Sequence, residues 1–204
     1  LFEVADNGIV VVIAAGNSGV EGSNPLNKLA LSENAIVVGA INDKDQVASY
    51  SSMGESINEN VVKPDILAPG GSKLPGHRNI LGAKANSDEI TGSQGTSISA
   101  AIISAAINIL IDARWNDWSS WSLQNTSLLA KSLKAILLMT ASETNLDRED
   151  NPSTEIDESI YSPGSYIGIP ATIKDIHEGY GRVNIQAAVE ALINYVSVNS
   201  SVQN

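Results

Sequence analysis

The sequence contains no cysteine, two histidines and a single phenylalanine among its 204 residues. Without cysteine, disulfides contribute nothing to stability, and the redox compartment is left open. Basic residues are also scarce, because 12 Lys and Arg face 23 Asp and Glu, which gives a net charge of −11. This acidity argues against nucleic acid and against an anionic membrane surface as binding partners.

Long hydrophobic runs are missing as well. No apolar run reaches the roughly 18 residues of a membrane span, and the first residues lack the pattern of a signal peptide, so we expect no membrane span. With 43% hydrophobic residues, the chain still has enough apolar material for the core of one domain. Residues 1–5 are typical of the C-terminal end of a helix.

Two short apolar runs predict strands of a parallel sheet. Residues 9–15 and 35–40 are rich in Val, Ile and Ala, which is typical of strands buried on both faces. Asn17 follows the first run directly, and ligands bind at the carboxyl ends of strands in open α/β sheets. Its side-chain amide is therefore a candidate hydrogen-bond donor to a ligand. The alternative is a turn asparagine in Gly-Asn-Ser-Gly.

A serine stands at the start of the most apolar stretch of the chain. Residues 95–99 read Gly-Thr-Ser-Ile-Ser, and an almost uninterrupted apolar run follows from 100 to 113. The pattern predicts a central helix whose first turn exposes Ser97. The free N–H groups and partial positive charge of a helix N-terminus stabilise an oxyanion, so Ser97 is the candidate nucleophile of an acyl transfer. The alternative is an N-cap serine on a core helix.

Five segments in this order resemble the subtilisin-like serine proteases (subtilases). They are residues 10–19, 35–40 followed by 48–54, 63–70, 95–99 and 179–184. The resemblance implies an α/β fold with a parallel sheet in three layers, and hydrolysis of polypeptides through an acyl-enzyme on Ser97. It implies an oxyanion hole made by Asn17 and the N–H of Ser97. It also implies that the substrate is bound by Ala14, Ala15, Gly16 and Thr96.

The helix start departs from the subtilase pattern. Relatives commonly read Gly-Thr-Ser-Met-Ala-Ser/Thr-Pro, whereas this chain has Ile98 for the methionine and Ala101 for the proline. Ile102 likewise replaces a common histidine. Without the proline, a fixed backbone angle is lost, so we expect the helix start and the nucleophile to be placed slightly differently.

A serine nucleophile needs a base, and the base needs an orienting acid. In subtilases the catalytic residues follow the order Asp, His, Ser along the chain. The motifs that contain the Asp and the His do not occur in this sequence. His77 and His177 do not occupy family positions, and the resemblance makes Asp65 structural. We therefore expect residues 1–204 to be the C-terminal part of one catalytic domain. Its partner would be an N-terminal fragment of the same precursor, separated by autoprocessing, that supplies the Asp and His.

The alternative is a catalytically silent subtilase relative that binds or regulates another protein. A cluster of all three tryptophans would then be its docking patch, although these rings could equally cover the end of the central helix. The cluster consists of Trp115, Trp118 and Trp121.

The resemblance carries further expectations about cofactors and location. The chemistry needs no cofactor, but subtilases often bind structural calcium, and the oxygen-bearing candidates are Asn42, Asp43, Asp147 and Asp150. Solvated loops are the alternative for these positions. The resemblance to subtilases predicts a secreted or extracytoplasmic protein. We expect residues 70–92 to form a solvated loop, the alternative being a segment that contacts substrate or a pro-segment beside the cleft. We also expect an outer helix at 128–140 and a final amphipathic helix from 185 to about 195.

Overall fold

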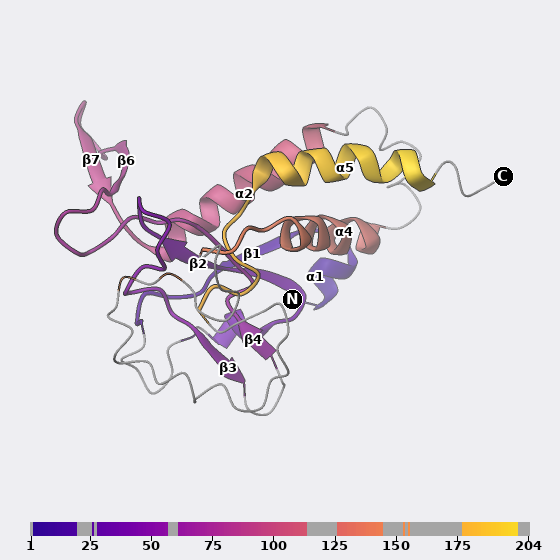
Figure 1. Cartoon of the computed structure of the whole chain (residues 1–204), viewed down its shortest axis with the longest axis horizontal. Coiled ribbons are helices and arrows are strands. Elements are labelled where there is room, and N and C mark those ends of the chain that lie inside the picture. Colours follow the sequence, from indigo (N-terminus) through magenta and orange to yellow (C-terminus); the bar gives the residue numbers. More distant parts are fainter. Residues whose placement is uncertain are drawn as a thin grey trace.

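Three parallel strands in the order β1-β2-β5 form the centre of the molecule (Figure 1). The computed structural model describes residues 2–19, 26, 28–56, 61–113, 126–144, 153, 155 and 177–199. The central strands are β1 (Val11–Ala14), β2 (Ala35–Ile41) and β5 (Ile66–Pro69). Both predicted strands are present, and the α/β class with a parallel sheet is confirmed.

The central strand β2 is buried over its whole length. β1 pairs with it in parallel register, with Val11 opposite Ala35. β1 itself is only half-buried, which differs from the expectation of a strand covered on both faces. The reason is its place in the sheet, since β2 is its only neighbour among the described strands.

The helices pack on one face of the sheet. α2 (Thr96–Ala113) lies against all three parallel strands and against α5 (Ile185–Asn199), while α4 (Thr126–Met139) packs on α5 and on α1 (Phe2–Asp6). The apolar side chains that meet between sheet and helices form one core. Its buried members are Ile36, Val38, Ile66, Ala68, Ile103, Ile107, Leu110, Leu133, Ile136, Leu137, Ala188 and Leu192.

The opposite face of the sheet has a smaller cover. Val37 and the half-buried Ile13 pack there with Ala30, which belongs to the short 3₁₀ helix η1 (Lys28–Leu31). β3 (Gly54–Ser56) and β4 (Val61–Lys63) form an antiparallel pair nearby in the sequence. Alternation of side chains along each strand therefore divides the apolar residues between two cores.

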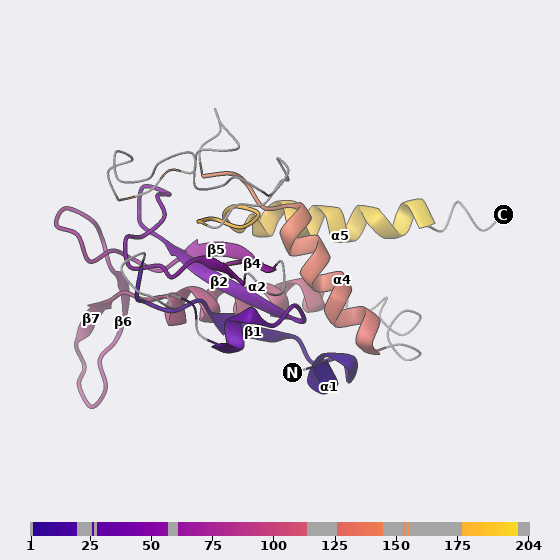
Figure 2. The ribbon, with the colours of Figure 1, turned by 90° about the horizontal axis from the view of Figure 1, so that it is seen from below.

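A second antiparallel hairpin occupies residues 80–93, in the segment where we expected only a loop. β6 (Ile80–Ala83) pairs with β7 (Ile90–Ser93), and Leu81 lies opposite Gly92. Figure 2 shows this hairpin projecting at one end of the molecule, with α5 extending toward the other. Nearly all of its side chains are exposed, including Leu81 and Ile90.

The Gly-Tyr-Gly-Arg segment lies beside β5. The N–H of Leu67 donates to the carbonyl of Gly181 at 2.9 Å, and the N–H of Val183 donates to the carbonyl of Leu67 at 2.8 Å. Gly179 has φ +68°, and a β-carbon there would lie 2.5 Å from two backbone oxygens. Glycine is therefore required where this segment turns against the start of β5.

One described helix, α2, is long and apolar enough to cross a membrane by length and composition. In this structure it packs on the sheet and carries Ser97 in its first turn. Those contacts are typical of the core helix of a folded domain.

Candidate active site

The carboxyl ends of the parallel strands and the start of α2 meet at one edge of the sheet. Asn17 lies three residues after the end of β1, and Gly70 directly follows β5. The N–H of Gly95, just before α2, donates to the carbonyl of Gly70 at 2.9 Å. The fold thus brings the two main sequence candidates, Asn17 and Ser97, to the place where ligands bind in sheets of this type.

The side chain of Asn17 is oriented by Thr96. Its Oδ1 accepts hydrogen bonds from the N–H of Thr96 at 2.9 Å and from the Thr96 hydroxyl at 3.0 Å. The same hydroxyl accepts from the N–H of Gly16 at 3.2 Å. Because two donors engage Oδ1, the chemistry of the contacts fixes which end of the amide is the oxygen. The Nδ2 group therefore points away from Thr96.

Asn17 and Ser97 border one small space above Gly95. A β-carbon built on Gly95 would lie 3.4 Å from Asn17 Nδ2 and 3.4 Å from Ser97 Oγ. Gly95 has φ +152°, a conformation that favours glycine, so no natural side chain fills this space. Among the hydrogen bonds of the described residues, none uses Asn17 Nδ2 or the N–H of Ser97. Two donors therefore remain for a ligand beside the serine hydroxyl.

Ser97 itself is exposed, although the helix behind it is firmly anchored. It is the second residue of the 18-residue helix α2, so it lies within the partial positive charge of the helix N-terminus. Ile103 and Leu110, further along α2, are fully buried in the core. An exposed hydroxyl on a rigid support is suited to nucleophilic attack.

The expected substrate-binding residues occupy different environments. Ala15 is fully buried with Ala30 and Val37, so it can offer a ligand only its backbone. Ala14 is half-buried, and the carbonyl of Gly16 accepts from the N–H of Ser52 at 3.0 Å. Thr96 is buried and uses its hydroxyl to hold Asn17, as described above. Contact between these residues and a substrate stays a prediction.

The calcium candidates at the end of β2 are engaged in other contacts. Asn42 Oδ1 accepts from the N–H groups of Lys44 and Gln46, and its Nδ2 donates to Glu155 at 2.9 Å. Asp43 lies 3.0 Å from His77 Nδ1, and this hydrogen bond lowers the pKa of the Asp43 carboxyl. In the described part of the chain, no three His, Asp or Glu side chains are grouped to hold a metal ion.

Calcium binding at Asn42 and Asp43 stays a prediction, since both side chains are engaged by protein groups in this structure. Asp147 and Asp150, like the tryptophan cluster, lie outside the described residues.

Neither histidine is hydrogen-bonded to Ser97. His77, which we had placed in a solvated loop, is mostly covered and pairs with Asp43. His177 is buried, and burial lowers its pKa to about 4, so it stays neutral at ordinary pH. Asp65 lies at the start of β5, away from the strand end that leads to Gly70. It accepts from Lys63 at 2.6 Å, in agreement with a structural role.

Sequence reasoning missed several groups that the fold brings together. Tyr50 and Ser99 place their hydroxyls against the exit of β5, and Glu178 is a fully buried carboxyl. Tyr50 and Ser99 lie within the motif segments, but no local pattern indicates what their hydroxyls bind, because their partners are distant in the sequence. Burial of a polar residue is the only signal, and it is visible only once the chain is folded.

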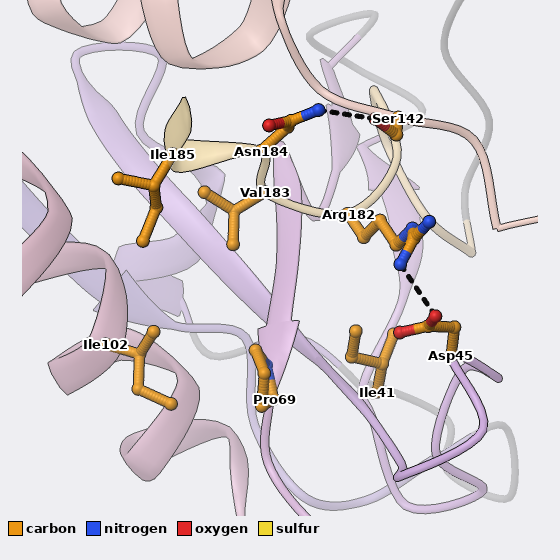
Figure 3. Close-up of a pocket in the computed structure, with 9 residues that line it drawn as sticks. All are labelled: Ile41, Asp45, Pro69, Ile102, Ser142, Arg182, Val183, Asn184 and Ile185. Atoms are coloured by element: carbon orange, nitrogen blue, oxygen red, sulfur yellow. Dashed lines mark hydrogen bonds and ion pairs between the residues drawn. The ribbon is translucent and has the colours of Figure 1, made fainter. Parts of the chain in front are cut away.

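A cavity of about 430 Å³ lies between the end of β5, α2 and the start of α5 (Figure 3). Ile41, Pro69 and Ile102 form apolar walls, and Arg182 pairs with Asp45 at 2.6 Å among its lining residues. Ser97 and Asn17 do not line this cavity. It is therefore separate from the space above Gly95, which remains the candidate site.

The fold and the site together define a class of protein. It is an α/β protein with an exposed serine at a helix N-terminus, beside two hydrogen-bond donors that have no partner among the described residues. The profile of the subtilase family matches residues 2–166. The chain therefore belongs to the subtilase family, as its motifs predicted.

Curated relatives agree with this assignment. The cell wall-associated protease of Bacillus subtilis (strain 168) is 30% identical over 189 residues, which are 92% of this chain and 18% of that protein. Serine protease AprX of the same organism is 47% identical over 70 residues, which are 31% of this chain and 15% of that protein. The chain thus spans less than a fifth of the length of these relatives.

Solved structures share the fold. The PatG macrocyclase domain has a TM-score of 0.63 at 22% identity, and the match covers 95% of this chain and 46% of that one. The self-cleaved protease domain of PatA has a TM-score of 0.61 at 20% identity, with 95% and 53% covered. The subtilisin-like fold is confirmed, and the chain corresponds to about half of each of these domains.

Proposed function

We propose that this chain is the C-terminal part of the catalytic domain of a serine endopeptidase, with Ser97 as its nucleophile. The observation that carries the proposal is the space above Gly95, where Asn17 Nδ2 and Ser97 Oγ each lie 3.4 Å from one point. A turn asparagine and an N-cap serine have no reason to converge in this way. An oxyanion hole beside a nucleophile requires it.

In the proposed reaction, Ser97 Oγ attacks the carbonyl carbon of a peptide bond and gives its proton to a base. The carbonyl oxygen becomes an oxyanion that accepts hydrogen bonds from Asn17 Nδ2 and the N–H of Ser97. The C–N bond then breaks, the amine leaves with the proton from the base, and the acyl group stays on Ser97. Water releases that acyl group by the same steps in a second attack.

The base and its orienting acid are proposed to come from an N-terminal part of the same precursor. Three observations support this part as a partner. The solved neighbours extend to about twice the length of this chain. The apolar strand β1 pairs on one side only among the described strands. α2 leaves an outward face uncovered, with Ile109 47% exposed.

We propose that the two parts are separate chains after autoprocessing. The support comes from one structural neighbour, which is described as a self-cleaved protease domain. The substrate is proposed to be a polypeptide that runs along the backbone of residues 14–16. A location outside the cytoplasm is proposed by analogy with the cell wall-associated relative.

The proposal is tested by labelling the assembled protein with a serine-directed fluorophosphonate, followed by peptide mapping. We expect one label, on Ser97, and none in a Ser97→Ala variant. Denaturing mass spectrometry of the same material should reveal a second polypeptide that carries an Asp and a His motif. A Ser104→Ala variant is the matched control, because Ser104 is an exposed serine on the same helix.

Absence of the label from an assembled, folded protein would refute the peptidase. A companion chain without the Asp and His motifs would do the same. Both results would favour the catalytically silent, protein-binding relative, for which Asn17 and Ser97 are remnants. Labelling of Ser97 without a separate companion chain would leave the peptidase standing and refute only the two-chain form.

A further inference from the structure

Three consecutive backbone carbonyls at the exit of β5 lie within hydrogen-bond distance of two donors at the start of α2, the Ser99 hydroxyl and the N–H of Gly95. The Ser99 hydroxyl lies 3.0 Å from the carbonyl of Ala68 and 3.2 Å from that of Pro69. The N–H of Gly95 donates to the carbonyl of Gly70 at 2.9 Å. The first turn of α2 is thus fastened to the end of β5 by a side chain and by backbone.

Burial makes the Ser99 hydroxyl different from the other serines of this helix. Ser99 is 0% exposed, and a buried hydroxyl costs free energy unless it is hydrogen-bonded. Its partners belong to another element of the fold. Ser104 on the same helix is exposed, and within the described part of the chain its hydroxyl donates to the carbonyl of Ala100, one turn back in α2. The Ser104 hydroxyl therefore fastens nothing to the sheet.

The Tyr50 hydroxyl also binds the backbone at the exit of β5. Its hydroxyl lies 2.7 Å from the carbonyl of Gly70 and 2.9 Å from that of Gly71, and the residue is 4% exposed. A β-carbon on Gly70 would lie 2.6 Å from Ser99 Oγ and 3.0 Å from the Tyr50 hydroxyl oxygen. The two hydroxyls therefore converge on the same residue at the β5 exit.

The start of α2 is consequently held at two points. Asn17 holds the N–H of Thr96 from the end of β1, and Ser99 holds the helix from the end of β5. Ser97 lies between these two anchors. At Ala101 the chain has no proline to fix the backbone near the helix start, so side-chain hydrogen bonds are left to supply the restraint.

We propose that Ser99 is a positioning residue, which holds the Ser97 hydroxyl in its attack geometry by fastening the first turn of α2 to the end of β5. Tyr50 supports the same junction. The proposal rests on the function proposed above for Ser97. A displacement of the nucleophile by about 1 Å can reduce the rate of a reaction on the order of 100-fold, so a restraint of this kind affects rate strongly.

The test measures how fast a fluorophosphonate labels the assembled protein at several reagent concentrations. For Ser99→Ala we expect the limiting rate constant to fall about tenfold or more, while the half-saturating concentration stays unchanged. The fraction of protein finally labelled should also stay unchanged, because it reports folding and not geometry. Ser104→Ala should react like the unsubstituted protein, and Tyr50→Phe should react slowly like Ser99→Ala.

Hydrogen exchange at Gly95 gives a second readout that does not depend on catalysis. Its amide donates to Gly70, so Ser99→Ala should exchange this hydrogen faster, on the order of tenfold, than Ser104→Ala does. Equal exchange in the two variants would overturn the proposal. If Ser99→Ala does not fold, the labelling rate and the hydrogen exchange at Gly95 are measured on Tyr50→Phe instead.

Two kinetic results would overturn the positioning role while the proposed function stands. One is a limiting rate constant for Ser99→Ala equal to that of Ser104→Ala. The other is a loss confined to the labelled fraction, since that would mean a structural role only. If the unsubstituted protein is not labelled at all, the proposed function fails and the positioning role fails with it.

Discussion

At the scale of single residues, the candidate site depends on the orientation of one amide. Asn17 Oδ1 accepts two hydrogen bonds from Thr96, which turns Nδ2 toward the space beside Ser97. Thr96 can do this because its own hydroxyl is held by the N–H of Gly16. The donor is thus aimed before any ligand arrives, and such preorganisation is what makes an oxyanion hole effective.

Replacing Asn17 with Ala should lower kcat about 100- to 1000-fold and leave KM nearly unchanged, because the lost donor acts on the transition state. That magnitude was measured on a subtilisin, a member of the same family. The assay is steady-state hydrolysis of a peptide substrate by the assembled protein. Asn7→Ala is the control, since Asn7 donates only to the carbonyl of Glu3 in α1. A rise in KM at constant kcat would contradict this role.

Two adjacent buried residues, His177 and Glu178, respond to pH in opposite directions. Burial raises the pKa of Glu178 to about 7, and a hydrogen bond shared with Glu143 adds to the effect. The folded protein then keeps a proton that the unfolded chain releases near pH 4.5, so Glu178 lowers stability as pH rises from 4.5 to about 7. His177, with its lowered pKa, costs stability as pH falls from 6.5 to about 4.

Glu178→Gln should therefore flatten the loss of stability toward neutral pH. The amide keeps an acceptor for the N–H of Thr144, which lies 2.8 Å from the Glu178 carboxyl, and it never ionises. Between about pH 5 and about pH 8, we expect the variant to gain on the order of 1–3 kcal/mol relative to the unsubstituted protein. Urea unfolding at both pH values measures this. An equal pH dependence of stability in both proteins would refute the conclusion that the buried Glu178 carboxyl stays protonated up to about pH 7.

At the scale of elements, the junction between β5 and α2 leaves no room at Gly70. A β-carbon there would lie 2.6 Å from the β-carbon of Ala40 and 2.6 Å from Ser99 Oγ. Both neighbours are fully buried: the β-carbon of Ala40 can move only with β2, and Ser99 Oγ can turn aside only by losing its contacts with the carbonyls of Ala68 and Pro69. The close approach of strand and helix therefore depends on glycine at this position.

Gly70→Ala should destabilise the protein by about 1–3 kcal/mol through overpacking. It should also slow the labelling of Ser97, because the helix start must move away from β5. Thermal unfolding and the labelling rate check the two effects. Gly82→Ala is the matched control, since a β-carbon at Gly82 meets nothing within 4 Å. A Gly70 variant as stable as the Gly82 variant would contradict the close packing.

The sequence predicted those elements that bury a continuous apolar run. β2 and α2 are marked by runs of Ile, Val and Ala; β2 begins at the expected residue and ends one residue later, and α2 places Ser97 in its first turn as expected. The hairpin β6-β7 was missed because Leu81 and Ile90 are exposed, so no alternation of buried and exposed side chains marks it. Ser97 and Asn17 were found through their motifs. Ser99 and Tyr50 were not, because their partners are distant in the sequence.

At the scale of the whole molecule, a buried ionic cluster around Asp65 joins the sheet to α4. Its carboxylate accepts from Lys63 at 2.6 Å and from the N–H of Val37 at 2.9 Å, and it lies 3.4 Å from Lys134. Lys134 also donates to the carbonyls of Glu33 and Ala35, both at 2.7 Å. β2, β5 and α4 are therefore connected through one carboxylate.

Asp65→Asn should cost about 3–5 kcal/mol of unfolding free energy, because the fully buried Lys63 then loses its ion pair with Asp65. Glu89→Gln is the control. It removes an exposed pair with Lys84 and should change stability by at most about 0.5 kcal/mol. Urea unfolding of the assembled protein compares the two. Similar stabilities for both variants would mean that the Asp65 cluster does not hold the elements together.

The hydrogen bonds from Thr96 to Asn17 join residues 79 positions apart in the chain. The Asn17 side chain is therefore oriented only after β1, the rest of the sheet and the start of α2 have packed together. A nascent or partly unfolded chain has the serine but not the oriented donor beside it. For the proposed peptidase, cleavage among folding chains would therefore begin only once this long-range contact between Thr96 and Asn17 has formed.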